Sequence, residues 1–433
     1  MSAAPAADAP FDPRWLELLA ESCQRLGRTS PRLCDLYLEH RLELEVSGVD
    51  GLLHGEECRT QGAAARWAFP RRTVLHASTG ASPQTVNELL ERYGPTPVAA
   101  ATRALPPTEL DAPRGWQEWA RDLVRRLTPP RASVRFLIRK AVVIRPGSWT
   151  VVVSPPLVRA RVFGDYDTAL LAVWDHPQLA HWLSELAEPP AKRRWAPGSA
   201  TQVPVVFTAG TAGVLLHELV GHLVEADLAG TGSSPLMRLK GASMTAASVQ
   251  LVDDATRLDL PGGFSCDDEG TPARPLEIIR AGVLVGWLCD LAGAERLGAE
   301  PGRGRRASWR HPPGPRLSNL VVSPGDTEPE ALEHDLKQGL VVTRLAGATV
   351  DPVSGRTVVR VERGWEVANG RRRRPLRPFE LTGGALEVLA NIDPNLGRDM
   401  VTDWRLGWCV KGGLPLPTGS LAPTMLVRRL EVL

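Results

Sequence analysis

Two histidines and a glutamate stand close together inside an apolar stretch of the sequence, TAGVLLHELVGHLVEADL, at residues 211–228. His217, Glu218 and His222 form the pattern H-E-x-x-x-H. Many zinc hydrolases use H-E-x-x-H, in which two histidines four residues apart bind zinc and the glutamate takes a proton from the metal-bound water. Because the present pattern is one residue longer, it indicates zinc chemistry only if the helix brings both imidazoles to one side.

A distorted helical turn would bring them together. Residues five apart on a regular α-helix are separated by about 140° around its axis. A π-bulge absorbs one extra residue and returns the two positions to nearly the same side. Gly221, directly before His222, would relax the backbone at that point. We therefore predict a strand at VPVVF (203–207), a loop, and a helix with a π-bulge between the histidines.

A catalytic zinc site also needs a third protein ligand. Glu225 lies three residues after His222 and thus on a neighbouring face of the helix. Cys409, as a thiolate, is a distant alternative. The residues alone leave this choice open. They also allow a simpler interpretation, in which the histidines are buried with ordinary hydrogen-bond partners and bind no metal.

The sequence patterns around these side chains predict an α+β fold with two domains, which would position them. Residues 35–46 alternate strictly between apolar and charged side chains, which is typical of a half-buried antiparallel strand. The stretch EPPAKRRWAPGSATQ at 188–202 is rich in proline and charge and indicates a domain boundary. We place an N-terminal α+β domain at 14–195 and a C-terminal domain at 196–433, with antiparallel or mixed sheets in both.

Two local signals refine the second half. Thr327 and Glu330 form a capping box, which predicts a helix that starts there and ends at Gly339. Asn369 and Gly370 are the residue types of a tight hairpin turn. The remaining short apolar segments indicate a strand-dominated domain.

The composition is that of an ordinary soluble globular protein. The chain has 433 residues, of which 43% are hydrophobic and 23% charged, and its net charge is +2. This gives no general reason to expect a nucleic-acid or membrane partner, and no segment approaches the roughly 20 apolar residues that span a bilayer. Residues 1–13 are predicted to be a disordered leader rather than an export signal. The six cysteines are scattered, which favours reduced thiols and a cytoplasmic location.

Three charged segments have alternative interpretations. Asp267, Asp268 and Glu269 could suggest a second metal site, but acids followed by Gly-Thr-Pro favour a tight turn. The run RRRRPLRP at 371–378 lacks interleaved aromatic residues, so we interpret it as a solvated or acid-paired face rather than a nucleic-acid site. The arginines of 303–316 are expected to contact peptide carboxylates or backbone carbonyls.

Four ordered blocks of the second half resemble the TldD/PmbA family, metallopeptidases once described as modulators of DNA gyrase. The motif helix GVLLHELVGHLVEAD is similar to the family's signature. It is followed by LVDDATRLDLPGGFSCDDEGTPARPLEIIRAGVLVGWLCD, by GRGRRASWRHPPGPRLSN and by WCVKGGLPLPTGSLAPTMLV. Together the blocks span roughly residues 203–430.

The resemblance implies a site and a reaction. The zinc ligands would be His217, His222 and Cys409, with Glu218 as the general base that activates the metal-bound water, and Glu225 would orient a ligand or remain a surface charge. The C-terminal domain would be a strand-rich, barrel-like metallopeptidase domain that carries the motif helix. Because this chain keeps the motif, it resembles the catalytic, TldD-like type.

The resemblance also implies substrates and partners. The expected activity is zinc-dependent hydrolysis of small unfolded or leader-type peptides. The expected assembly is a dimer, with a heterodimer with a TldE/PmbA-like homologue as one form. The alternative is a non-catalytic, zinc-binding regulatory subunit of such a complex. Arg303, Val410 and Leu414 depart from residues common in the family, and they are expected near the substrate groove.

Overall fold

The computed structural model describes most of the chain, namely residues 11–28, 32–69, 72–93, 110–127, 131–163, 168–187, 195–197, 202–230, 232–405 and 407–433. Residues 1–10 of the predicted leader lie outside this part. Its last three residues are described: Phe11 is buried, the Asp12 side chain accepts a hydrogen bond from the backbone N–H of Arg14, and Pro13 begins helix α1. The predicted boundary segment, 188–202, is described only at 195–197 and 202, so the boundary at 195/196 stays a prediction.

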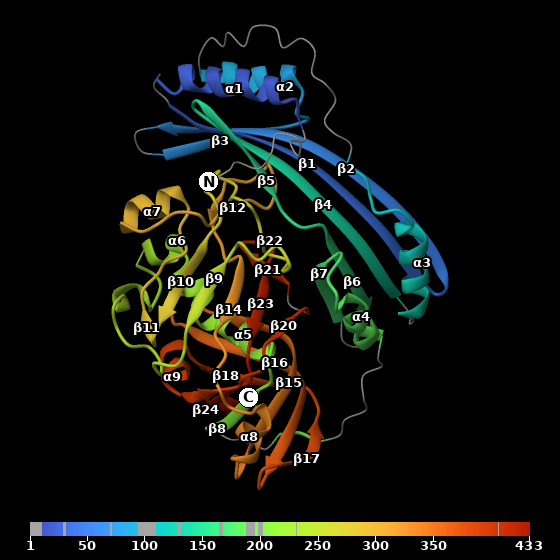
Figure 1. Cartoon of the computed structure of the whole chain (residues 1–433), viewed down its shortest axis with the longest axis vertical. Helices are drawn as coiled ribbons and strands as arrows, with labels where there is room; N and C mark the ends of the chain where they lie inside the picture. Colours follow the sequence, from blue (N-terminus) through green and yellow to red (C-terminus); the bar gives the residue numbers. More distant parts are fainter. Residues whose placement is uncertain are drawn as a thin grey trace.

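The N-terminal half is one antiparallel sheet with helices on one face (Figure 1). Its strand order is β3-β2-β1-β4-β6-β7, and β5 pairs with β4. The strands are β1 (Arg32–Val49), β2 (Leu52–Phe69), β3 (Arg72–Thr79), β4 (Arg131–Arg145), β5 (Ser148–Val153), β6 (Leu157–Phe163) and β7 (Thr168–Val173). The helices are α1 (Pro13–Leu26), α2 (Pro83–Leu90), α3 (Trp116–Arg126) and α4 (Leu179–Ala187).

Strand β1 has an apolar face that packs under these helices. Leu36 and Leu38 contact the cluster of α1 and α2, whereas Leu42 and Leu44 contact that of α3 and α4. The predicted strand is therefore confirmed, but its description as half-buried is wrong for residues 35–40. Asp35 and Glu39 are buried because the C-terminal half packs over this end of the polar face.

A closed five-stranded barrel forms one part of the C-terminal half. The order β15-β8-β24-β18-β16 returns to β15, with β15 and β8 parallel and the other pairs antiparallel. The strands are β8 (Val203–Phe207), β15 (Gln338–Val350), β16 (Arg356–Ala368), β18 (Phe379–Gly384) and β24 (Met425–Val432), joined at their edges by β17 (Arg371–Leu376) and β19 (Ile392–Leu396). The predicted α+β class with a barrel-like C-terminal domain is confirmed.

A six-stranded mixed sheet and two short hairpins complete this half. The sheet order is β11 (Val283–Leu284), β10 (Pro275–Arg280), β9 (Leu251–Asp254), β14 (Asn319–Val322), β23 (Gly419–Ala422) and β20 (Val401–Asp403). The hairpins are β12 (Gly304–Arg305) with β13 (Gly314–Pro315), and β21 (Trp408–Lys411) with β22 (Leu414–Pro417). The helices are α5 (Thr211–Leu216), α6 (Ala226–Gly230), α7 (Leu291–Leu297), α8 (Pro329–His334) and α9 (Ala385–Ala390).

Of the two local predictions for the second half, the hairpin turn is confirmed and the capping box is wrong. Asn369 and Gly370 both have positive φ and join β16 to β17, as predicted. The capping box is wrong: Thr327 donates its backbone N–H to Leu396 O at 3.1 Å, and α8 begins at Pro329. The helix cannot reach Gly339, because β15 has already started at Gln338. No helix within the described ranges has the length and apolar character to cross a bilayer.

Candidate metal centre

The motif helix changes its winding at the histidines. α5 continues as a π-helical turn, His217–Gly221, and then as a 3₁₀ turn, His222–Val224. The backbone N–H of His222 donates to His217 O, the i to i+5 bond of a π-turn. The predicted π-bulge is therefore confirmed at the predicted position.

Gly221 is needed in this turn for space. Its dihedral angles, φ −51° and ψ −56°, are ordinary helical values, so the predicted relaxation of the backbone is not what distinguishes it. A Cβ atom at this position would lie 2.7 Å from Leu317 Cδ1. Leu317 is fully buried, and the absence of a side chain at 221 lets the helix approach it closely.

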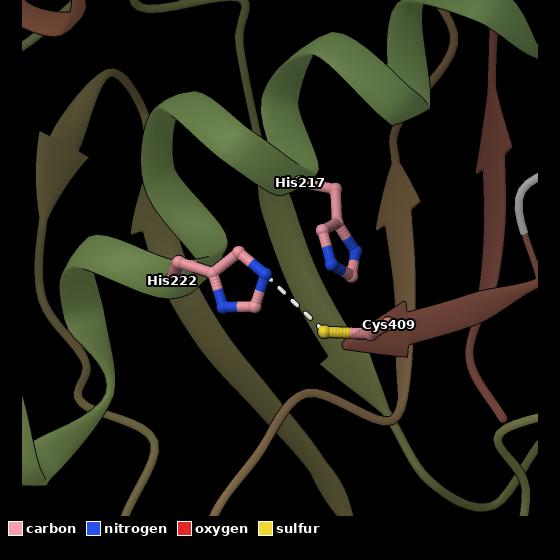
Figure 2. Close-up of side chains that lie close together, drawn as sticks. All are labelled: His217, His222 and Cys409. Atoms are coloured by element: carbon pink, nitrogen blue, oxygen red, sulfur yellow. Dashed lines mark hydrogen bonds between the residues drawn. The ribbon is translucent and has the colours of Figure 1, made fainter. Parts of the chain in front are cut away.

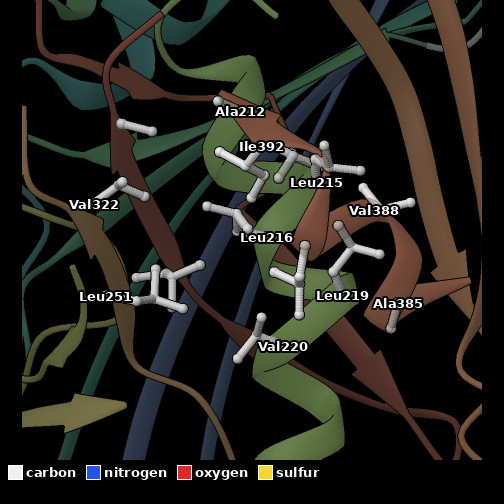
Figure 3. Close-up of a cluster of buried hydrophobic side chains, with 14 of the residues drawn as sticks. Ala212, Leu215, Leu216, Leu219, Val220, Leu251, Val322, Ala385, Val388 and Ile392 are labelled. Atoms are coloured by element: carbon white, nitrogen blue, oxygen red, sulfur yellow. The ribbon is translucent and has the colours of Figure 1, made fainter. Parts of the chain in front are cut away.

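Apolar packing fixes the orientation of this helix. Leu215, Leu216, Leu219 and Val220 are buried in the core between the barrel and the mixed sheet (Figure 3). Removing such side chains from water is the main favourable term available to position a helix. The remaining side of the helix carries the histidines and faces a cleft of about 660 Å³.

Cys409 meets the two histidines from the opposite wall (Figure 2). It lies on β21, is 5% exposed, and its Sγ is 3.2 Å from His222 Nε2. The centres of the imidazole rings of His217 and His222 are 4.9 Å apart, and the planes of the rings are nearly perpendicular, at 84°. One possible ligand atom from each of the three residues lies within 4.8 Å of the others. The geometry thus brings together the three residues that the resemblance selected.

The surroundings favour a thiolate at Cys409. Burial alone would raise the pKa of this thiol, but hydrogen bonds and charge from His217 and His222 outweigh it and hold the pKa well below its usual value. Arg316 Nη2 donates to Cys409 O at 2.7 Å and to Sγ at 3.3 Å. A thiolate is the form that binds metals, and two imidazoles with a thiolate suit zinc.

Glu225 lies behind His222 instead of beside the cysteine. Its Oε2 is 3.2 Å from His222 Nδ1 and 2.7 Å from Lys411 Nζ, and its Oε1 accepts the backbone N–H of Leu317 at 3.3 Å. Burial would raise its pKa, but His222 and the nearby cations lower that pKa to about 2. An ionised carboxylate can only accept a hydrogen bond, so it favours the tautomer of His222 that carries its proton on Nδ1. The other nitrogen, Nε2, then faces the sulfur of Cys409. The geometry therefore gives Glu225 an orienting position.

Glu218 is the carboxylate that faces the cleft. It lines the same cavity as His217, His222 and Cys409. The carboxylate of Glu218 has no hydrogen bond or ion pair with the described residues, so it is available to a ligand in the cleft. Burial raises its pKa above that of an exposed glutamate. A carboxylate with these properties is suited to exchanging protons with a water or substrate in the cleft.

The arginines of 303–316 are mostly internal. Arg303 pairs with Asp253, and Arg306 pairs with Asp35 of the N-terminal sheet at 2.8 Å. Arg305 donates to Leu317 O and to Pro417 O. These arginines contact carboxylates and backbone carbonyls of the chain itself, and their contact with a peptide stays a prediction. No local feature of the sequence indicates that Arg316 contacts Cys409 or that Lys411 contacts Glu225, because both contacts are tertiary.

The other charged segments behave as predicted. Asp267 Oδ1 accepts the N–H groups of Glu269 and Thr271, at 3.0 and 2.8 Å, in a tight turn. In the arginine run on β17, Arg372 pairs with Glu333 of helix α8 and Arg374 pairs with Glu366 of β16.

Sequence comparison decides the family. The profile of the PmbA/TldA metallopeptidase C-terminal domain matches residues 200–433. The chain belongs to the PmbA/TldA metallopeptidase family. The resemblance found in the four sequence blocks is thereby confirmed.

Curated relatives match about half of the chain. A metalloprotease TldD homolog of Buchnera aphidicola from Schizaphis graminum is 32% identical over 230 residues, which are 53% of this chain and 47% of that protein. A zinc metalloprotease TldD homolog of Saccharolobus solfataricus is 28% identical over 237 residues, 54% of this chain and 52% of that protein. The match thus spans about half the length of these relatives.

Solved structures share the fold over nearly the whole chain. TldE from Thermococcus kodakarensis superposes with a TM-score of 0.68 at 15% identity, covering 92% of this chain and 96% of TldE. A candidate modulator of a DNA gyrase from Thermotoga maritima gives a TM-score of 0.67 at 17% identity, covering 92% and 95%. At such low identity these likenesses concern the fold alone.

Proposed function

We propose that this protein is a zinc-dependent peptidase with His217, His222 and Cys409 as zinc ligands and Glu218 as general base. The observation that carries the proposal is the convergence of two imidazoles and a cysteine within 4.8 Å in a cleft that also contains Glu218. Membership of a metallopeptidase family and the names of the relatives support it.

The donor set fits the metal. Two imidazole nitrogens and one thiolate form a three-ligand set of the catalytic type, which leaves a coordination position for water or substrate. The depressed pKa of Cys409 favours the form that binds zinc. When bound, Zn²⁺ polarises a carbonyl group and makes a water molecule more acidic.

The side chains of the protein would then handle the protons. Glu218 accepts a proton from the water that attacks the scissile carbonyl and later donates it to the leaving amine. Glu225 holds His222 in the tautomer and orientation that present Nε2. The walls of the cleft include the β15 segment 347–350 and the β21–β22 hairpin, which suits an extended chain better than a folded protein.

Substrates and partners follow as part of this proposal. We expect small unfolded or leader-type peptides as substrates. We also expect a dimer, and the fold shared with TldE makes a TldE/PmbA-like homologue the natural partner in a heterodimer. All six cysteines are free thiols in the structure, which agrees with the cytoplasmic location proposed from the sequence.

Glu218→Gln tests the mechanism directly. Peptide cleavage and zinc content are measured for the parent, for this variant, and for Glu295→Gln, which alters an exposed glutamate on α7. We expect zinc in all three proteins and a loss of about a hundredfold or more in cleavage only for Glu218→Gln. Equal activity of the parent and Glu218→Gln would reject the mechanism. Zinc without activity in any of the three, with the partner homologue supplied, would favour the regulatory-subunit alternative.

A further inference from the structure

A second cavity, of about 490 Å³, lies between the two halves of the molecule. One wall is the face of the N-terminal sheet opposite its helices, formed by β1, β4 and β6. The other wall is formed by residues 305–311 and the β21–β22 hairpin. Figure 1 shows this hairpin between the N-terminal sheet and the rest of the C-terminal half. Trp408 lines both this cavity and the metal cleft.

The cavity lining is strongly cationic. Most of its arginines have a carboxylate partner: Arg135 pairs with Glu45 and Arg139 with Asp268, each at 2.5 Å. The lining contains more arginines than carboxylates, however. The arginines are Arg41, Arg135, Arg139, Arg159, Arg305, Arg306 and Arg310, and the acids are Glu43, Asp267 and Asp268.

Arg159, on β6, is one lining cation without a carboxylate partner. Within the described part of the chain, no carboxylate lies within 4.0 Å of its guanidinium, and its buried Nε has no hydrogen-bond partner. Its direct neighbour across the sheet is another cation, Arg135. Burial and the charges of Arg161 and Arg135 lower the pKa of Arg159 to about 10, so it is still a cation at neutral pH. Its guanidinium carbon is 5.5 Å from the centre of the Trp408 ring.

Arg305 adds a second cation without a carboxylate partner. It is 7% exposed, and the acceptors of its guanidinium are the carbonyl oxygens of Leu317 and Pro417. Burial also lowers its pKa to about 10. Carbonyl oxygens hold a guanidinium in place but do not neutralise it. Two cations, Arg159 and Arg305, therefore line one cavity without a direct carboxylate partner. Glu45 attracts Arg159, and Asp268 and Asp253 attract Arg305, only at longer range. Burial of incompletely paired cations is costly, and an anion that enters the cavity would reduce that cost.

We propose that this cavity binds a carboxylate carried by a peptide, with Arg159 as its principal counter-ion. A guanidinium fork matches the two oxygens of a carboxylate. Leu137, Leu157 and Trp408 supply apolar wall beside it, which suits an anion that carries side chains better than a free inorganic ion. The choice of a peptide as the carrier rests on the proposed function, but the recognition of a carboxylate does not.

The position of Trp408 connects this cavity to the metal centre. Neighbouring residues on a strand point to opposite sides, so Trp408 faces the N-terminal sheet while Cys409 faces the histidines. A ligand against Arg159 would thus contact the residue next to the proposed sulfur ligand. The hairpin is the shared wall of both cavities.

Binding of uncharged and charged forms of one peptide tests the proposal. Titration calorimetry is done with acetylated tetra-alanine bearing either a free carboxylate or an amide at its C-terminus. The protein is the full chain with Glu218→Gln, so that the probe is not cleaved. We expect the free acid to bind at least about tenfold more tightly than the amide. A second pair of amidated peptides, with Glu or Gln at position two, shows whether an acidic side chain can supply the carboxylate.

Substitution of Arg159 tests whether the preference for the free acid over the amide arises in this cavity. Arg159→Gln should abolish the preference for the acid, and Arg159→Lys should keep part of it. Arg373→Gln, on the exposed β17 strand, is the matched control and should leave it unchanged. The melting temperature should not fall in Arg159→Gln, because an unpaired cation is removed.

Two results would overturn the proposal. One is equal binding of the acid and amide forms of both peptides, and the other is a preference for the acid that survives Arg159→Gln. If Arg159→Gln does not fold, Arg159→Lys replaces it in the test. This variant keeps the positive charge, so complete loss of the preference for the acid in Arg159→Lys would also contradict the proposal. Failure of the native chain to cleave peptides would reject the proposed function and leave this binding comparison intact.

Discussion

Cys409 Sγ lies 3.2 Å from His222 Nε2, although the two residues are 187 positions apart in the chain. The contact depends on two separate pieces of structure. The π-turn rotates His222 into the cleft beside His217, and β21 brings the sulfur from the opposite wall. Glu225 forms a hydrogen bond with the other ring nitrogen of His222, Nδ1. This contact orients the imidazole so that Nε2 faces the sulfur.

The close approach at Gly221 predicts a sensitive position. Gly221→Val would place side-chain atoms against Leu317, because even a Cβ atom there meets Leu317 Cδ1 at 2.7 Å. We expect a loss of about 2 kcal/mol in unfolding free energy and weaker zinc binding, since the turn that carries both histidines must shift. Denaturant titration and zinc titration measure the two effects. Gly55→Val is the control, because a Cβ atom at Gly55 would meet only Glu45 O, at 4.0 Å; comparable losses in both variants would refute this reasoning.

Glu225 is predicted to tune the metal site without binding the metal. Glu225→Gln keeps the size of the side chain but removes the charge that holds His222 Nδ1. Zinc affinity should therefore fall by about 10- to 100-fold while one zinc still binds at saturation. Asp227→Asn is the matched control, because Asp227 contacts the same Lys411 and not His222. Complete loss of zinc in Glu225→Gln would instead make Glu225 a ligand.

The interface between the two halves contains a buried ion network. Asp35 pairs with Arg66 and with Arg306, and its side chain is 1% exposed. Asp35→Ala leaves buried arginine charge without its partner, so we expect a loss of about 3–5 kcal/mol in unfolding free energy. Glu333→Ala, which removes the partner of Arg372 on exposed β17, should cost under about 1 kcal/mol. Equal effects in thermal or denaturant unfolding would show that the interface network does not stabilise the protein.

The sequence predicted the elements whose causes are local. The π-turn follows from the spacing of His217 and His222, and the turn at Asn369-Gly370 follows from residue type. Cys409 could be selected only by family resemblance, because nothing in its neighbouring residues distinguishes a ligand from a buried thiol. The competing Glu225 was closer in sequence, and only tertiary structure shows that it lies behind the imidazole.

Burial of the polar face of β1 could not be read from the sequence. Strict alternation predicts which residues share a face, and it does so correctly for β1. It cannot tell whether the charged face meets solvent or another domain whose arginines are complementary to it. The same limit applies at Thr327, where pairing with a distant strand segment overrides a local capping signal.

Metal content before and after replacement of one sulfur tests the central claim most directly. The parent, Cys409→Ser and Cys58→Ser proteins are loaded with Zn²⁺, dialysed against a weak chelator and analysed by elemental spectroscopy. Cys58 is exposed on β2 of the N-terminal sheet and does not line the metal cleft, so its substitution serves as the control. We predict one zinc per chain in the parent and Cys58→Ser proteins, and a loss of most of the zinc in Cys409→Ser. Unchanged zinc occupancy in Cys409→Ser would contradict the account.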